Sequence, residues 1–307
     1  MKCAVLGGAG FIGSHLAERL LAAGHAVRVF GLHDPGPASG YPRHRDIEWM
    51  SGDFLDREHV SKAIAGCDAA FHLVSTTLPK SSNENPISDV ESNIIGTLRL
   101  LDAWKHEGGG KVVFVSSGGT VYGVPRTVPI GEEHPTCPIS SYGVTKLTIE
   151  KYLELYRVLH GVDYCVLRLS NPYGERQRVE SGQGAVTTFL YRAHRNEPIE
   201  IWGDGSVVRD YLYVGDVAEA LVRALSYKGQ HRIINIGSGV GRDLNQIVSA
   251  IERVIGRPLE RRHLPGRNFD VPANVLNISL ARSELGWQPA TSFEEGLVRT
   301  LRWIAGS

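Results

Sequence analysis

A tyrosine and a lysine, Tyr142 and Lys146, stand four residues apart near the middle of the chain. On a helix this spacing places both side chains on one face, about one turn from each other. A neighbouring ammonium group lowers the pKa of a phenol from its reference of about 10, so that a phenolate near neutral pH can take a proton from an alcohol. Such a pair alone is more often a solvated helix face, and its context decides between the two interpretations.

A loop rich in glycine follows a short apolar run at the N-terminus, and its glycines are Gly7, Gly8, Gly10 and Gly13. Glycines let the backbone approach a pyrophosphate, whose charge is favoured by the free amides and the dipole of the helix that follows. The spacing G-x-x-G-x-x-G is a variant of the dinucleotide fingerprint. We therefore expect a dinucleotide cofactor bound by Gly7, Gly10, Phe11, Ile12 and Gly13.

This loop changes the interpretation of the tyrosine and the lysine. The pair lies downstream of it and shortly after an apolar run that ends in Ser116-Ser117. Beside a nicotinamide cofactor, Tyr142 would deprotonate an alcohol while a hydride leaves, and Lys146 would also hold the nicotinamide ribose. We therefore predict a nicotinamide-dependent enzyme with Tyr142 and Lys146 at its catalytic centre.

The end of the second apolar run bears on the choice between NAD and NADP. The fingerprint expects an acidic residue there for the ribose hydroxyls, but Val27 to Phe30 leads to Gly31. His33 or Asp34 in the following loop could take its place, and no arginine that would accept a 2′-phosphate comes directly after the run. NAD is therefore favoured over NADP.

Short apolar runs alternate with segments of helical periodicity through the first half of the chain. This alternation predicts an α/β fold of the Rossmann type, with a doubly wound parallel sheet. The expected strands are Cys3 to Leu6, Val27 to Phe30, Ala69 to Leu73, Val112 to Ser116 and Tyr164 to Leu169. The expected helices are Phe11 to Ala23, Val60 to Ala65, Ser88 to His106 and Tyr142 to His160.

The pattern changes after Asn171-Pro172, where a loop rich in Gly, Arg and Gln leaves the sheet. Val217 to Leu225 and Ile233 to Ile236 then have the patterns of a helix and a strand that return to it. We expect a dinucleotide-binding domain of residues 1–171 plus 211–236. A smaller, discontinuous C-terminal substrate lobe would consist of residues 172–210 plus 237–307.

The composition argues against several classes of protein. In the 307 residues, 33 basic side chains balance 33 acidic ones, so no broad positive field attracts nucleic acid. The cysteines are scattered without a C-x-x-C pair, and we expect neither disulfides nor a metal site. There is no signal-peptide pattern and no run that approaches the roughly 20 apolar residues of a membrane span. We expect a cytoplasmic protein that does not bind membranes.

Over nearly its whole length the chain resembles the extended short-chain dehydrogenase/reductases of the nucleotide-sugar epimerase family, and it is similar to UDP-glucose and UDP-N-acetylglucosamine 4-epimerases. The motifs that carry the resemblance are together specific for the family, and much less so for the substrate. They are Gly7-Gly8-Ala9-Gly10-Phe11-Ile12-Gly13, Gly52-Asp53, Asn93 before Gly96-Thr97, Ser116-Ser117 before Val121-Tyr122-Gly123, Tyr142 with Lys146, Asn171-Pro172, Arg209-Asp210-Tyr211, and Arg267 with Asp270.

The resemblance implies roles for residues beyond the glycine loop and the Tyr-Lys pair. On the cofactor side, it implies that Asp53 binds adenine and that Asn93 supports the site, and we add Phe54, Leu73 and Ser116. On the substrate side, it implies Asn171 at the sugar diphosphate, Arg209 and Arg267 as phosphate clamps, Asp270 at the uridine ribose, and Thr120 and Asn274 near the sugar. Arginine suits a phosphate clamp because its donors form a fixed fork.

Position 118 departs from the family's pattern. Members usually carry Ser or Thr four residues before the tyrosine of Val-Tyr-Gly, and this chain has Gly118 there. The hydroxyl that contacts the reacting sugar oxygen must then come from Ser117, Thr120 or a water molecule, and we favour Ser117 as the catalytic group. The run Val74-Ser75-Thr76-Thr77 is also unusual, because small apolar residues are general there. Ser75 or Thr76 either offers a hydroxyl toward nicotinamide or sugar or is merely solvated.

The resemblance predicts an NAD-dependent 4-epimerase of UDP-hexoses that acts through a transient 4-keto sugar. Asn274 occupies a position at which a bulky tyrosine restricts some members to plain hexoses, so UDP-N-acetylhexosamines are expected substrates too. An NADPH-dependent reductase of nucleotide-4-keto sugars is one alternative. A noncatalytic nucleotide-sugar-binding protein, suggested by Gly31 and Gly118, is another. By analogy alone, the product would supply surface polysaccharide synthesis.

The two long helices expected at 88–106 and 142–160 carry more apolar residues than one buried face needs. Pairing with a second copy in a four-helix interface would bury the excess, and complete burial inside one subunit is the alternative. We expect a homodimer.

Overall fold

The structure of the chain is a computed structural model that describes residues 1–33, 44–107, 110–179, 184–266 and 271–306. Asp34, Arg267 and Asp270, which the sequence raised as candidates, lie outside these ranges. Within the ranges, no helix is both long enough and apolar enough to cross a bilayer. The same residues contain no group of three or more His, Cys, Asp or Glu side chains arranged to hold a metal ion.

Seven parallel strands form the central sheet, in the order β10-β6-β5-β4-β1-β2-β3, which confirms the predicted Rossmann-type α/β fold. Each predicted strand is present with small differences at its ends. The strands are β1 (Lys2–Leu6), β2 (Ala26–Gly31), β3 (Ile47–Ser51), β4 (Ala69–His72), β5 (Lys111–Ser117), β6 (Asp163–Leu169) and β10 (Ile233–Ile236).

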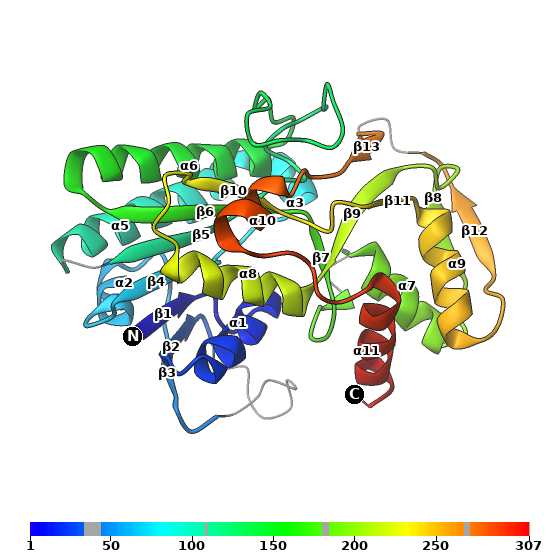
Figure 1. Cartoon of the computed structure of the whole chain (residues 1–307), viewed down its shortest axis with the longest axis horizontal. Coiled ribbons are helices and arrows are strands. Elements are labelled where there is room, and N and C mark those ends of the chain that lie inside the picture. Colours follow the sequence, from blue (N-terminus) through cyan, green and yellow to red (C-terminus); the bar gives the residue numbers. More distant parts are fainter. Residues whose placement is uncertain (34–43, 108–109, 180–183, 267–270, 307) are drawn as a thin grey trace.

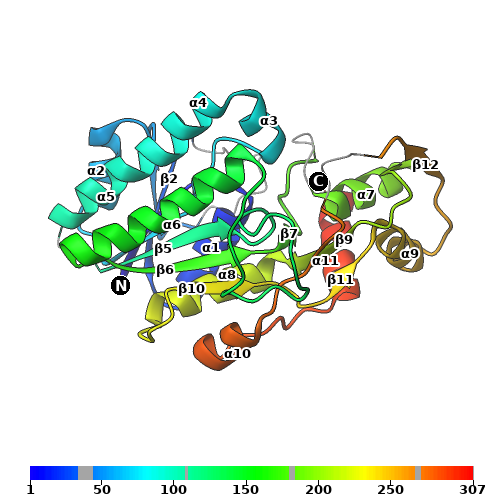
Figure 2. The same ribbon diagram turned by 90° about the horizontal axis from the view of Figure 1, so that it is seen from above.

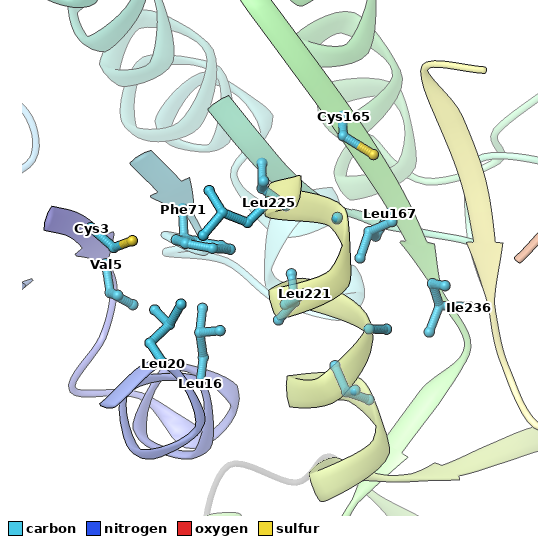
Figure 3. Packing of buried hydrophobic residues seen from close by; sticks show 14 of the residues in the cluster. Cys3, Val5, Leu16, Leu20, Phe71, Cys165, Leu167, Leu221, Leu225 and Ile236 are labelled. Carbon is cyan, nitrogen blue, oxygen red and sulfur yellow. The ribbon is translucent and has the colours of Figure 1, made fainter. Parts of the chain in front are cut away.

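Helices cover both faces of this sheet (Figure 1). On one face lie α1 (Phe11–Ala22) and α8 (Val214–Ser226), and on the other lie α2 (Arg57–Ile64), α5 (Gly96–His106) and α6 (Ser141–His160). Side chains alternate along each strand, so Cys3 and Val5 join the first core, shown in Figure 3, and Ala4 and Leu6 join the second. Two separate apolar layers therefore hold the sheet in place.

The helix expected at 88–106 is divided into three parts. It consists of α4 (Pro86–Asp89), a π-helix η2 (Val90–Ile95) and α5. Side chains bond to backbone carbonyls around the irregular turns: Ser92 Oγ donates to Ser88 O over 2.6 Å, and Asn93 Nδ2 donates to Asp89 O over 3.0 Å. Single π turns inside helices often occur at functional sites, and this one lies beside the candidate site described below.

The C-terminal part of the chain forms a third apolar core, beside one end of the sheet (Figure 2). Its elements are β7 (Asn171–Tyr173), α7 (Ala185–His194), β8 (Ile199–Trp202), β9 (Val208–Tyr213), β11 (Gly241–Arg242), α9 (Leu244–Ile255), β12 (Arg261–Leu264), β13 (Ala273–Asn274) and α11 (Phe293–Ala305). We keep the two-lobe division of the sequence as a proposal. One segment assigned to the C-terminal lobe lies with the other domain, because α10 (Ser279–Leu285) and Trp287 pack into the core of the sheet.

Candidate active site

Tyr142 and Lys146 lie in the first turns of α6, which begins beside the end of β5. Ser140 caps the helix by accepting from Gly143 N at 3.2 Å. Lys146 Nζ lies 5.5 Å from the centre of the Tyr142 ring and donates to Val115 O over 3.2 Å. The structure thus brings the phenol and the ammonium group together at the end of the sheet.

The expected lowering of the Tyr142 pKa is wrong for the protein alone. Burial raises the pKa of Tyr142 to about 12, and the nearby Asp89 acts in the same direction. Burial lowers the pKa of Lys146 to about 8. The Lys146 ammonium group lies over the ring and donates to the carbonyl of Val115 instead of to the phenol oxygen. Desolvation of the phenol therefore has the larger effect on the pKa of Tyr142. Deprotonation of Tyr142 therefore requires further positive charge in the site.

The glycine loop has the geometry that a dinucleotide pyrophosphate requires. Gly7 has a φ of +81°, and a Cβ on Gly13 would lie 2.5 Å from the carbonyl oxygen of Gly7. Helix α1 begins at Phe11, and no side chain of the described residues caps its first turn. Its N-terminal amides and dipole are therefore available to an anion. The residues present fit a nicotinamide dinucleotide.

The other expected cofactor residues lie at the carboxyl ends of neighbouring strands. Asp53, just after β3, is exposed and accepts from Leu55 N at 2.8 Å. Phe54 is buried against the ring of His72, with 5.1 Å between ring centres. Leu73 is half-buried directly after β4, and its backbone donates to Leu6 O over 2.9 Å. Since parallel strands end at one edge, these residues share the edge at which Gly7 follows β1.

Asn93 hydrogen-bonds to the loop after β4. Asn93 and this loop both donate to the buried carboxylate of Asp89, which sequence reasoning missed. Asn93 Nδ2 donates to Asp89 Oδ1 over 3.0 Å, and Asn93 Oδ1 accepts from Thr76 N at 3.2 Å. Asp89 is fully buried and also accepts from Ser141 Oγ at 2.8 Å and Thr145 Oγ1 at 2.7 Å, on both sides of Tyr142. The only sequence signal for Asp89 is its place one helical turn before Asn93.

The Ser116 hydroxyl bonds to a side chain of α6, and the expected contact of Ser116 with the cofactor stays a prediction. It donates to Glu150 Oε1 over 2.5 Å, and Glu150 forms a buried ion pair with Arg168 of β6 at 2.6 Å. The alternation of β5 turns Ser116 toward α6. Its role is to help hold the catalytic helix on the sheet.

Asn274 is buried against Gly118, in the loop that follows β5. Its side chain is 1% exposed, and Nδ2 donates to Gly118 O over 3.1 Å. A neighbour from the same segment, Leu276, fills the space beside Gly118, so that its methyl groups would be 2.6 and 2.9 Å from a Cβ at that position. The C-terminal lobe therefore contacts the loop directly.

The expected phosphate-binding residues lie on two paired strands. Asn171 of β7 donates to Asp210 O over 2.9 Å, and Arg209 of β9 donates to Val271 O over 2.6 Å. A cavity lies in the same lobe, lined by Trp202, Gly203, Asp204, Ser206, Val207, Gly266 and Pro272. Sequence reasoning did not identify this cavity. Two of its lining residues, Val207 and Pro272, are close in sequence to Arg209 and to its partner Val271.

Three comparisons with known proteins agree with this geometry. Residues 3–237 match the model of the family described as NAD dependent epimerase/dehydratase. A putative UDP-glucose 4-epimerase of Methanocaldococcus jannaschii is 35% identical over 301 residues, which are 98% of this chain and 97% of the relative.

Solved structures are similar over the full length. The UDP-glucose 4-epimerase of Thermotoga maritima with UDP-glucose superposes with a TM-score of 0.94 at 35% identity, covering 100% of this chain and 99% of that one. The UDP-N-acetylglucosamine 4-epimerase of Methanobrevibacter ruminantium, in complex with UDP-N-acetylmuramic acid, has a TM-score of 0.92 at 28% identity, covering 99% and 98%. The chain with this glycine loop and this Tyr-Lys pair thus belongs to the NAD dependent epimerase/dehydratase family.

Proposed function

We propose that this protein is a 4-epimerase of UDP-hexoses that uses NAD. The observation that carries the proposal is the Tyr142–Lys146 pair on α6, beside the strand edge at which the glycine loop opens. The names of similar proteins support the same reaction on UDP-sugars. β2 ends at Gly31 instead of at a ribose-binding carboxylate. We still propose a preference for NAD over NADP, because no arginine that would accept a 2′-phosphate comes directly after the strand.

In the proposed reaction, Tyr142 is the base and then the acid. Its phenolate takes the proton of the sugar C4 hydroxyl, and after the 4-keto sugar has turned its other face, Tyr142 returns the proton. NAD, when bound, supplies the hydride acceptor and donor at C4. Lys146, whose pKa of about 8 leaves it charged at neutral pH, stabilises the phenolate and would hold the nicotinamide ribose. C4 is inverted without net oxidation.

The substrate part of the proposal rests on both lobes. Arg209 and Asn171 lie on the paired strands β9 and β7, and we propose that they bind the diphosphate between the sugar and the nucleoside. We propose that Arg267 and Asp270 complete this site. Asn274 is smaller than tyrosine, so we also propose that the site accepts an N-acetyl group at C2.

Proton NMR of the purified protein with UDP-glucose, and separately with UDP-N-acetylglucosamine, tests the proposal without added cofactor. We expect the C4 epimer of each to appear, because the cofactor is regenerated within every turnover. Conversion of UDP-glucose alone would refute N-acetyl acceptance. No conversion, even after NAD is added, would refute the epimerase, and consumption of NADPH with a nucleotide-4-keto sugar would then favour a reductase.

We propose a homodimer that pairs the outer faces of α5 and α6, which pack side by side in Figure 2. Ile149 and Leu153 are buried within the subunit, but Val158 and Leu159 of α6 are 63% and 62% exposed. Sedimentation velocity should show a dimer that Val158→Glu dissociates, whereas Val240→Glu, at an exposed site in the other lobe, should not. A wild-type monomer would contradict the proposal.

A further inference from the structure

The hydroxyl that the family usually carries at position 118 has no room in this chain. The methyl groups of Leu276 would stand 2.6 and 2.9 Å from a Cβ at Gly118, and Leu276 is fully buried. The carbonyl of Gly118 is held by Asn274 Nδ2 at 3.1 Å. If the protein is the proposed epimerase, on which this inference rests, another group must contact the phenol and the reacting oxygen.

The hydroxyls of Ser117 and Thr120, in the same loop as Gly118, do not contact the phenol of Tyr142 in the structure described. Ser117 Oγ stands 3.7 Å from where a Cβ on Gly119 would be, and it forms no hydrogen bond with Tyr142. Thr120 Oγ1 is buried without a partner, and its Cβ would be 3.2 Å from a Cβ on Gly143. Thr120 therefore packs beside the helix that carries Tyr142 without reaching the phenol.

Ser75, in the loop after β4, does reach it. Its side chain is exposed and lies close enough to the phenol of Tyr142 to act on it as a donor, which lowers the pKa of that phenol against the effect of burial. The same hydroxyl donates to Thr77 O over 3.3 Å. The loop starts beside the dinucleotide site, because Val74 N would lie 3.0 Å from a Cβ on Gly7. Ser75 thus stands between the glycine loop and the phenol, open to a ligand.

The buried carboxylate of Asp89 joins the loop that carries Ser75 to the helix that carries Tyr142. It accepts from Thr77 Oγ1, two residues after Ser75, and from Ser141 and Thr145, which flank Tyr142. Two further bonds join the helix α3 (Pro79–Glu84) to the start of α6: Tyr142 N donates to Ser82 Oγ over 3.0 Å and Ser141 N donates to Asn83 Oδ1 over 2.8 Å. The Ser75 loop and the catalytic helix are therefore one hydrogen-bonded unit.

We propose that Ser75 replaces the missing hydroxyl at position 118, donating to the Tyr142 oxygen and contacting the sugar oxygen that loses its proton. Both departures of the sequence from the family's pattern, glycine at 118 and a polar run at 74–77, then have one explanation. A donor to a phenolate stabilises the charged form, and the contact with sugar orients the hydroxyl that reacts.

Kinetics of Ser75→Ala and Ser75→Thr test the proposal. Loss of one donor at a reacting oxygen costs about a hundredfold in kcat, so we expect that loss for Ser75→Ala and recovery for Ser75→Thr, which keeps the hydroxyl. The limb of the pH profile on which Tyr142 deprotonates should move to higher pH in Ser75→Ala. A residue that only supports the loop would lower stability without moving this limb.

Tyrosinate absorbance, as the difference between each protein and its Tyr142→Phe derivative, gives a readout without turnover. We expect Tyr142 to ionise at higher pH in Ser75→Ala than in wild type. An active wild type with an unchanged kcat in Ser75→Ala, or a loss found instead in Ser117→Ala, would overturn the inference and leave the epimerase intact. A wild type inactive on every UDP-sugar would refute the proposed function, and an unshifted tyrosinate titration would still refute the role of Ser75.

Discussion

Tyr142→Phe should lower kcat by about 10²- to 10⁴-fold, the range that a positioned acid and base contributes. Phenylalanine preserves the ring over which Lys146 stands, at 5.5 Å, and removes only the oxygen that takes the C4 proton. Ser75, whose hydroxyl lies near the phenol and lowers its pKa, is exposed and can bond to water instead. Turnover of UDP-glucose followed by NMR measures the effect.

Binding and stability separate this result from a folding defect. The variant should unfold at the same denaturant concentration as wild type. It should bind UDP with unchanged affinity in calorimetry, because the residues that we propose bind phosphate lie on β7 and β9 and not on α6. A variant that epimerises at the wild-type rate would remove Tyr142 from the mechanism and would favour a noncatalytic sugar-binding protein.

Glu150→Ala should cost about 3–5 kcal/mol of unfolding free energy, the usual loss when one partner of a buried ion pair is removed. Glu150 and Arg168 are 1% and 3% exposed, and two hydrogen bonds of 3.0 and 2.6 Å join them. Ser116 donates to the same carboxylate at 2.5 Å. Removal would leave the guanidinium of Arg168 buried without its charge partner, and urea unfolding measures the loss.

Two comparisons test the cause of that loss. Glu154→Ala removes a carboxylate one turn further along α6. The Glu154 and Arg157 side chains are 45% and 41% exposed, so this loss should cost much less. Glu150→Leu with Arg168→Met replaces both charges, and it should recover most of the stability because no charge stays unpaired. Equal losses from Glu150→Ala and Glu154→Ala would refute the account.

Local sequence patterns were enough to predict the fold and the framework of the site. Short apolar runs such as Cys3 to Leu6 and Tyr164 to Leu169 became strands because an apolar layer covers each face of the sheet. The glycine loop and the Tyr-Lys pair were recognisable since their geometry depends on residues a few positions apart. The expected roles of Asp53 and Asn93 came from the family resemblance, which depends on short motifs of the same kind.

Tertiary contacts decided what the sequence left open. The Ser116 hydroxyl on Glu150, three of the four donors to the buried Asp89, and the Leu276 side chain against Gly118 all join residues more than ten positions apart. The pKa of Tyr142 was mispredicted for the same reason, since desolvation by surrounding segments outweighs a lysine one turn away. Spacing along the chain determines which groups can meet, whereas burial and partners, which set their chemistry, depend on how the distant segments pack.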